Sequence, residues 1–401
     1  MRIIGIVCEY NPFHKGHEYQ IAKSRELLGE DAAVVCVMSG DFVQRGEAAL
    51  FSKYARAEAA CRCGADLVAE LPLPWAVSSA EGFARGAVSI LAELGAEFIS
   101  FGSESGDVSE LEKIADCLLD PAMHYKIKAE MDADASLSYA SARQKALFKT
   151  IGETSALISE PNNILAVEYI RAIKELGLNV KPMTVMREGA SHDAPEKSGA
   201  FASASELRRM FEAGEDCEAY IPEAACNIFE REIRIGRVID RDRMDTAILS
   251  RLRSLSENDF EMLRDGENGV GRRIFRAVGS CSTLDDIARD ASTKRYAFSR
   301  IKRMCICAAL GINKIGRDDL PKYTRVLAAT DRGFTVLREC GGGDLTIITK
   351  PAHARAMNGE IAEMSASCAN AHDMYVLAYM GKEHRNGGED WKTGPIIVHN
   401  D

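Results

Sequence analysis

Short runs of hydrophobic residues alternate with longer amphipathic stretches through the first two hundred residues of the chain. The runs are rich in β-branched residues, as in strands buried on both faces, and turn residues end them. They predict strands at 2–8, 33–38, 66–70, 97–101 and 180–186. Between them, hydrophobic positions at helical spacing predict helices ending at Gly29 and over 52–63, 80–94, 161–176 and 203–213. Such alternation predicts a doubly wound, Rossmann-like α/β fold with an open parallel sheet.

Beyond residue 215 this alternation of strands and helices stops, and hydrophobic residues at helical spacing dominate as far as residue 312. Short strand-like runs return after about 322, around a loop of three consecutive glycines at 341–343. A chain of 401 residues exceeds the size at which one hydrophobic core stops growing. We therefore expect an α/β domain over 1–215 and a mostly helical C-terminal domain over 216–401, with a small mixed closing unit from about 322.

Composition is that of a globular protein, with 46% hydrophobic and 27% charged residues. No hydrophobic run reaches the length of a membrane span, and the first residues do not resemble a signal peptide. The expected location is the cytoplasm. Twelve cysteines form no C-x-x-C pair, so we expect small core residues and no zinc site. The oligomeric state is not indicated.

Positive charge is concentrated in one part of an acidic chain. The net charge is −10, yet residues 271–325 hold thirteen Lys or Arg against five Asp, which leaves −18 for the remainder. The helix expected after Ser292 carries Arg295, Arg300, Lys302 and Arg303. Such an excess favours contact with a nucleic-acid backbone. The alternative is an ordinary solvated helix face.

The first predicted strand leads directly into a motif with two histidines. His14, Gly16 and His17 follow the turn residues Asn11 and Pro12 and stand at the start of the next helix. A helix N-terminus carries unpaired N–H groups and partial positive charge, so it attracts phosphate, and a glycine there leaves room for a nucleotide. A chance His-x-Gly-His is the alternative, which the position after the first strand disfavours.

The motif resembles the HxGH signature of the nucleotidyltransferase superfamily related to class I aminoacyl-tRNA synthetases. The wider pattern resembles the tRNA(Met) cytidine acetate ligase family. It includes Glu-Tyr-Asn-Pro-Phe-His-Lys-Gly-His at 9–17, Met-Ser-Gly-Asp-Phe-Val-Gln-Arg-Gly-Glu at 38–47, and shorter matches at 70–72, 79–81, 101–104 and 393–398. The resemblance implies ATP as a substrate with Mg²⁺, and acetate and elongator tRNA(Met) as partners.

The resemblance also implies the residues of the site. His14, His17 and Lys15 would be catalytic groups that contact the ATP phosphates and stabilise their developing charge. The implied ATP-binding residues are Val7, Asn11, Phe13, Gly16, Gln20, Gly102, Asn162, Arg187, Ser203, Ser205 and Arg208. Helix capping is an alternative explanation of Asn162 and Ser203, because Ser203 and Glu206 have the spacing of a capping box. The family usually has Tyr where this chain has Ser191, next to His192.

The implied reaction needs no covalent enzyme intermediate. No Gly-x-Ser-x-Gly elbow or persuasive Cys-His pair is present. Acetate would attack the α-phosphorus of ATP, and the acetyl-adenylate would acetylate N4 of the wobble cytidine of elongator tRNA(Met). Two alternatives remain: a small-molecule adenylyltransferase or carboxylate-amine ligase on the same fold, and a non-catalytic RNA-binding protein.

Overall fold

The computed structural model describes residues 1–134, 136–187, 201–263, 266–312, 319–340 and 343–399. Its main sheet contains β1 (Ile3–Cys8), β2 (Ala33–Ser39), β5 (Leu67–Leu71), β6 (Phe98–Ser103), β7 (Lys181–Met186), β8 (Tyr323–Thr330), β9 (Thr346–Ile348) and β10 (Ile396–Val398). A short hairpin of β3 (Phe42–Val43) and β4 (Glu47–Ala48) follows β2. The five strands expected in the first 190 residues are confirmed within a residue or two at each end.

The main sheet has the order β10-β8-β5-β2-β1-β6-β7, with β9 paired to β8. Its strand pairs are parallel except that β8 runs antiparallel to β5. The chain leaves β1 toward β2 and β5 on one side and later crosses to β6 and β7 on the other. This reversal between β1 and β6 is the switch point at which open α/β sheets bind ligands. The doubly wound prediction is confirmed.

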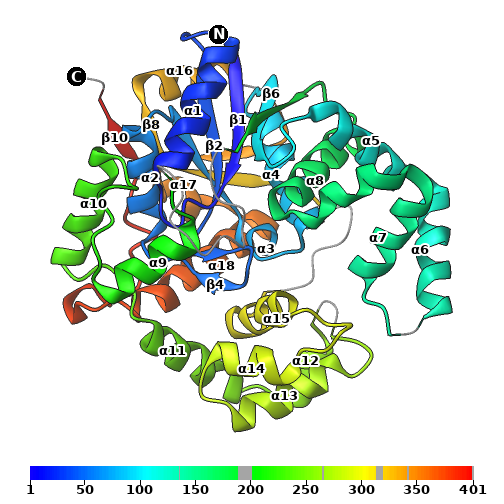
Figure 1. Ribbon diagram of the computed structural model, residues 1–401. Coiled ribbons are helices and arrows are strands. Elements are labelled where there is room, and N and C mark those ends of the chain that lie inside the picture. Colours follow the sequence, from blue (N-terminus) through cyan, green and yellow to red (C-terminus); the bar gives the residue numbers. More distant parts are fainter. Residues whose placement is uncertain (135, 188–200, 264–265, 313–318, 341–342, 400–401) are drawn as a thin grey trace.

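Helices cover both faces of the sheet (Figure 1). One face packs against α1 (Lys15–Leu28), α2 (Lys53–Arg62), α9 (Ala204–Ala213) and α10 (Glu223–Arg234). The other packs against α4 (Ala80–Glu93), α5 (Val108–Leu119), α6 (Pro121–Ala133), α7 (Tyr139–Ile151), the 3-10 helix Gly152–Ser159, α8 (Pro161–Glu175) and α16 (Asp331–Glu339). Val34 and Cys36 enter the first core, while Val35 and Val37 enter the second. Burial on both faces explains why the strands are almost continuously hydrophobic.

A third core belongs to a cluster of helices beyond the carboxyl edge of the sheet (Figure 1). It is built from α11 (Arg241–Arg253), α12 (Glu257–Glu261), α13 (Val270–Ser280), α14 (Leu284–Ala291), α15 (Phe298–Leu310), α17 (Pro351–Ala356) and α18 (Gly359–Val376). Phe42 after β2, and Leu73 in α3 (Leu73–Ala76) after β5, also enter this core. The loops at the carboxyl edge are therefore packed directly against the helical part. Among the helices that the structure describes, none is both long and apolar enough to cross a membrane.

The structure divides the chain differently from the sequence-based expectation. Helix α10 lies after residue 215, but it packs against α2 on the sheet. The segment after 322 forms no separate closing unit, because β8, β9 and β10 extend the main sheet at its β5 edge. Helices α11 to α15 are thus inserted between α10 and β8, while α17 and α18, which complete their core, lie between β9 and β10.

A buried ionic network fastens the C-terminal segment to the sheet. The Lys53 side chain, 0% exposed, donates to both oxygens of Glu70 at 2.9 and 3.1 Å and to Asp390 Oδ2 at 2.7 Å. Tyr54 donates to the other oxygen of Asp390, and Arg325 of β8 donates to the Asp390 carbonyl at 2.6 Å. Buried charges are tolerated only when they are paired in this way. The start of α2, strand β5 and the C-terminal segment therefore stabilise one another.

A second buried pair joins α18 to the loop after β2. His372 Nδ1 lies 2.8 Å from Asp41 Oδ2, and its Nε2 lies 3.5 Å from Glu389. Burial alone would lower the pKa of His372, but the Asp41 carboxylate and the hydrogen bonds to Asp41 and Glu389 raise it to about 10. His372 is therefore an imidazolium at neutral pH, and the pKa of Asp41 lies below its usual range.

Stability should consequently fall above neutral pH. The unfolded chain releases the His372 proton near a pKa of about 6.5, whereas the folded chain keeps it up to about 10. We expect the free energy of unfolding to drop by about 1–2 kcal/mol from pH 6 to pH 8. In His372→Asn the amide can still donate to Asp41 but does not titrate, so this drop should be absent. Urea melts of both proteins at pH 6 and pH 8 would measure this drop. An equal drop in the wild type and in His372→Asn would contradict the raised pKa of His372.

Candidate active site

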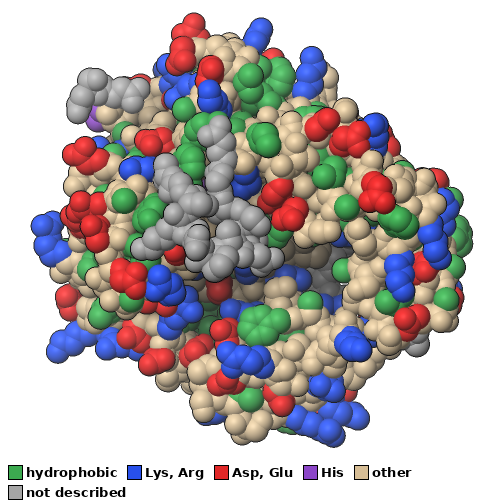
Figure 2. All heavy atoms as spheres, in the orientation of Figure 1, with side chains coloured by type: hydrophobic (Ala, Val, Ile, Leu, Met, Phe, Trp, Pro, Cys, Tyr) green, Lys and Arg blue, Asp and Glu red, His purple; other side chains and the backbone are tan. Residues whose placement is uncertain are grey.

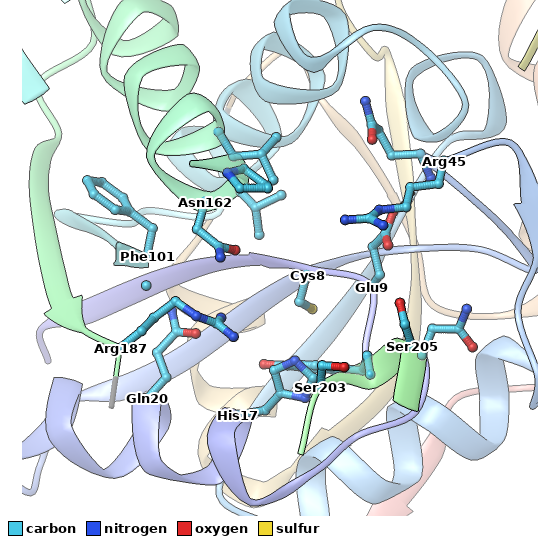
Figure 3. Close-up of a pocket in the computed structure, with 18 of the residues that line it drawn as sticks. Cys8, Glu9, His17, Gln20, Arg45, Phe101, Asn162, Arg187, Ser203 and Ser205 are labelled. Carbon is cyan, nitrogen blue, oxygen red and sulfur yellow. Dashed lines mark hydrogen bonds between the residues drawn. The ribbon is translucent and has the colours of Figure 1, made fainter. Parts of the chain in front are cut away.

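A cavity of about 350 Å³ opens at the carboxyl edge, where β1 and β6 lie side by side (Figure 3). Its walls come from the ends of β1, β6 and β7, the starts of α1, α8 and α9, and the β3–β4 hairpin. A smaller cavity of about 40 Å³ adjoins it between α1 and Arg187. The segments at or just beyond the carboxyl ends of β1, β2, β5 and β6 are 11–17, 39–45, 71–75 and 102–104. Three of them contribute to the cavity, whereas 71–75 does not: Leu71 and Trp75 enter the core of one sheet face and Leu73 enters the third core.

Two imidazoles cap helix α1. His14 is the N-cap residue, and its Nδ1 accepts the backbone N–H of Gly16 at 3.1 Å. His17 Nδ1 accepts the backbone N–H of His14 at 3.2 Å, and the two rings stack with centroids 3.7 Å apart. Because each Nδ1 accepts a hydrogen bond, a neutral ring must carry its proton on Nε2. The cap therefore fixes the tautomer of both side chains.

Both rings are neutral at physiological pH. Burial lowers the pKa of His14 to about 3, with a further contribution from the Arg187 guanidinium. Burial, His14 and Arg187 together hold the pKa of His17 well below its usual value. Each ring thus offers one N–H donor at Nε2 and no free acceptor. This arrangement suits an anion whose negative charge grows during a reaction.

The residues around the histidines hold them in place. Tyr10 and Phe13 pack against the His17 ring, with centroids at 4.8 and 5.5 Å. A Cβ at Gly16 would come within 2.9 Å of the His14 ring. The space that glycine leaves here is occupied by His14, so Gly16 serves the cap itself.

Two of the expected site residues lie outside the cavity. The Lys15 ammonium donates to the Ala219 carbonyl at 2.7 Å, on the outer side of α1, and is absent from the cavity lining. Its prediction as a catalytic group was wrong, because the first residue of the helix points away from the cap. Phe13 is fully buried behind His17, so its direct contact with ATP was wrong as well.

The other expected residues lie together. Val7, Asn11, His14, Gly16, His17, Gln20, Gly102, Asn162, Arg187, Ser203, Ser205 and Arg208 line the two adjoining cavities. In Figure 3, Arg187, Gln20 and Phe101 lie at one end of the large cavity, and Glu9, Arg45 and Ser205 lie at the other. Their individual roles in binding ATP stay predictions.

Several of these side chains also have structural partners. Ser203 caps α9 through the Glu206 N–H at 3.2 Å, whereas the reciprocal half of the predicted capping box is absent from the described hydrogen bonds. Asn162 is not the cap of α8, which is Glu160, but donates to Glu104. The buried Asn11 accepts the Leu50 N–H, while its Nδ2 has no partner among the described residues. An orphaned donor in the cavity wall is a fitting contact for a phosphate or a ribose hydroxyl.

Arg208 contacts the turn that leads to the two histidines. Its guanidinium donates to the Asn11 carbonyl at 2.8 Å, to Ser205 at 3.2 Å and to Glu47 at 3.1 Å. It is thereby held at the cavity wall opposite the start of α1. An arginine fixed in this way can bind phosphate oxygens without first losing much side-chain freedom.

Sequence reasoning missed another group of lining residues. They are Glu9, Gln44, Arg45, Glu47, Phe83, Phe101, Leu165 and Tyr169. Glu9, Gln44, Arg45 and Phe101 stand at or just beyond strand ends, a position that marks ligand loops in this fold. Phe83 and Tyr169 lie within helices, and their hydrophobic spacing indicated only a core.

Among the predicted RNA-binding residues, Lys302 does not fit its role. Its side chain is 10% exposed and lies 3.3 Å from Glu47 and 2.9 Å from Asp285. This residue is an internal ion pair and was wrongly predicted to contact RNA. Arg295 is exposed and Arg300 and Arg303 are partly exposed, and both Arg295 and Arg300 lie over the Tyr296 ring. Figure 2 shows Lys and Arg side chains at the hollow on this face of the molecule, with Asp and Glu side chains among them.

No group of three or more His, Cys, Asp or Glu in the described part of the chain could hold a metal ion. Ser191, His192, Lys314 and Arg317 lie outside the described residues.

Known proteins resemble this chain over nearly its whole length. A sequence model of the HIGH Nucleotidyl Transferase family matches residues 1–390. A tRNA(Met) cytidine acetate ligase of Caldanaerobacter subterraneus is 37% identical over 94% of this chain and 96% of its own. Another, from Syntrophomonas wolfei, is 36% identical over 99% of both chains. The crystal structure of apo Thermotoga maritima TmcAL has a TM-score of 0.93 at 31% identity, and the form bound with alpha-thio ATP has 0.91 at 30%, each covering 100% of both chains.

The fold and the HxGH site therefore define a nucleotidyltransferase of the HIGH family. Within that class, the chain belongs to the tRNA(Met) cytidine acetate ligase family.

The capping geometry separates two functions of His17 that mutation can test. His17→Ala removes both the acceptor for the His14 N–H and the Nε2–H donor, whereas His17→Asn keeps an acceptor at the δ position but has no donor at Nε2. We expect both variants to lose on the order of a hundredfold or more in adenylate formation. Pyrophosphate exchange into ATP measures the reaction, and thermal melting should show that Asn preserves the fold better than Ala. Near-normal exchange in the Asn variant would show that the donor is dispensable.

Proposed function

We propose that this protein is an ATP-dependent ligase that activates acetate as acetyl-adenylate and acetylates N4 of the wobble cytidine of elongator tRNA(Met). The observation that carries the proposal is the pair of neutral, Nε2-protonated histidines at the start of α1, inside a cavity at the sheet's switch point. Membership of the family supports the same reaction. Its setting would be the cytoplasm, where tRNA is used.

The first step is adenylyl transfer to acetate. One carboxylate oxygen of acetate forms a bond to the α-phosphorus of ATP, and the bond between this phosphorus and the bridging oxygen to the β-phosphate breaks. Pyrophosphate leaves with that oxygen. His14 and His17 donate to phosphate oxygens that gain charge, and Arg208 binds the leaving phosphates.

Mg²⁺ would be bound mainly by the phosphates themselves. The described residues provide no carboxylate cage, and Mg²⁺ commonly binds with several waters and few protein ligands. When bound, it neutralises charge on the triphosphate. His14, His17 and Arg208 still have to orient that triphosphate.

The proposed RNA surface lies next to the cavity. The turn between β3 and β4 touches α15 so closely that a Cβ on Gly46 would come within 2.4 Å of the Arg303 backbone nitrogen. Gln44 and Arg45 of the same hairpin line the cavity. An RNA backbone on Arg295, Arg300 and Arg303 would thus bring an unpaired base within reach of the activated acetyl group.

Direct assay of the reaction tests the proposal. The protein is incubated with ATP, isotopically labelled acetate and total tRNA, and the digested nucleosides are analysed by mass spectrometry. Labelled N4-acetylcytidine that requires all three substrates is the expected result. Pyrophosphate exchange without tRNA acetylation would favour the small-molecule ligase, and absence of any ATP-dependent reaction would favour the RNA-binding alternative.

Charge reversal on α15 tests the RNA surface. Arg300→Glu combined with Arg303→Glu should weaken tRNA binding and lower the slope of log affinity against log salt by about one unit per lost phosphate contact. ATP affinity should not change. The control is Arg2→Glu with Arg338→Glu, two exposed positions near the opposite, amino edge of the sheet that alter net charge equally. If both double variants weakened tRNA binding equally, the effect would come from net charge alone and not from a binding surface on α15.

A further inference from the structure

The second step of the proposed reaction needs a proton acceptor. The exocyclic amine of cytosine must lose a proton when it forms an amide bond. The neutral histidines cannot take this proton, because each Nδ1 already accepts a backbone N–H and each Nε2 carries its own proton. The base must come from elsewhere in the cavity.

Five glutamates line the cavity within the described chain: Glu9, Glu47, Glu104, Glu160 and Glu206. Both oxygens of Glu47 are engaged, by Arg208 and Lys302. Both oxygens of Glu104 are engaged, by Asn162 and the Asn163 backbone. Glu160 is the N-cap residue of α8 and Glu206 lies in the first turn of α9, so neither belongs to the turn that follows β1.

Glu9 differs from the other four in position and in bonding. It directly follows the central strand β1, in the same turn that leads to His14 and His17. Its Oε1 accepts the backbone N–H of Gln44 at 2.7 Å, whereas Oε2 has no hydrogen bond to any described residue. The carboxylate is thus fixed through one oxygen and has the other available.

Several charged and polar groups surround Glu9. Burial raises the pKa of its carboxyl group, the Gln44 hydrogen bond opposes this, Glu47 adds to it, and Arg45 and Arg208 oppose it. From the α8 side, the phenol of Tyr169 also faces Glu9, whose charge contributes to a raised pKa of that phenol. A carboxylate with a raised pKa is a stronger base than an exposed glutamate.

We propose that Glu9 is the general base of the acetyl-transfer step, an inference that rests on the proposed function. The cytosine N4 forms a bond to the acetyl carbonyl carbon, and one N4 proton passes to Glu9 Oε2. The bond between that carbon and the AMP oxygen breaks, and AMP leaves as an anion. His14 and His17 donate to its phosphate oxygens. Adenylate formation from acetate, which arrives already ionised, does not use Glu9.

Glu9→Gln separates the two half-reactions. Glutamine can still accept the Gln44 N–H but cannot take up a proton. We expect acetate-dependent exchange of pyrophosphate into ATP to stay within about twofold, while single-turnover transfer of acetyl from preformed adenylate to tRNA falls a hundredfold or more. Glu18→Gln is the matched control: this partly exposed glutamate on α1 is absent from the cavity lining, and both half-reactions should be unchanged.

The pH dependence provides a second measurement. In the wild-type protein the transfer rate should rise with pH as Glu9 ionises, at a pH above that expected for an exposed glutamate, and then level off. Glu9→Gln should lack this rise, and Glu9→Asp should retain it with a lower plateau. The Asp variant keeps the test available if the Gln variant does not fold.

Four results would count against the assignment or its basis. Normal transfer by Glu9→Gln, or an unchanged pH profile, would overturn the role of Glu9. Equal loss of exchange and transfer would overturn it too, because Glu9 would then position the nucleotide. A wild-type protein that never acetylates tRNA would instead overturn the proposed function, so the two failures are distinguishable.

Discussion

Helix α1 is capped by imidazoles, and the chemistry of the cavity depends on that cap. A helix N-terminus needs acceptors for its first N–H groups, and serine or aspartate usually supplies them. Here the Nδ1 atoms of His14 and His17 do so. One set of hydrogen bonds therefore completes the helix, fixes both tautomers and leaves an N–H donor at Nε2 of each cavity-lining ring. Gly16 is required by the same cap, because a side chain there would displace the His14 ring.

The cavity depends on residues that come from the far end of the chain. Asp41 lies in the loop after β2 and Glu70 in β5, and these are paired with His372 and Lys53 respectively. Asp390 joins the Lys53 pair from the C-terminal segment. Since an unpaired charge in such a place is costly, the C-terminal segment must return before the carboxyl edge of the sheet reaches its final form. The Lys53–Asp390 contact joins residues 337 positions apart, so both ends of the chain contribute to one core.

The sequence predicted the five central strands and their helices because local hydrophobic spacing determines them. It could not predict that β8 pairs with β5, since a lone strand gives no local sign of an antiparallel partner more than 250 residues away. Within the site, motif and strand-end position identified His14, His17, Asn11 and Arg208 correctly as cavity residues. Lys15 and Lys302 were misjudged because residue type does not reveal side-chain direction: one bonds to a loop carbonyl and the other is an internal ion pair.

Lys302 lies between the cavity and the proposed RNA surface. Glu47 accepts from Arg208 in the cavity and from Lys302 on α15, so a single carboxylate balances one cation on each side of the hairpin. Lys302 in turn contacts Asp285 of α14, which carries the ionic contact into the helical insertion. A Cβ at Gly46 would come within 2.4 Å of the Arg303 backbone nitrogen, so the hairpin and α15 are in close contact. Because Gln44 and Arg45 of this hairpin line the cavity, RNA held on the outer arginines of α15 would lie next to the cavity that contains Glu9.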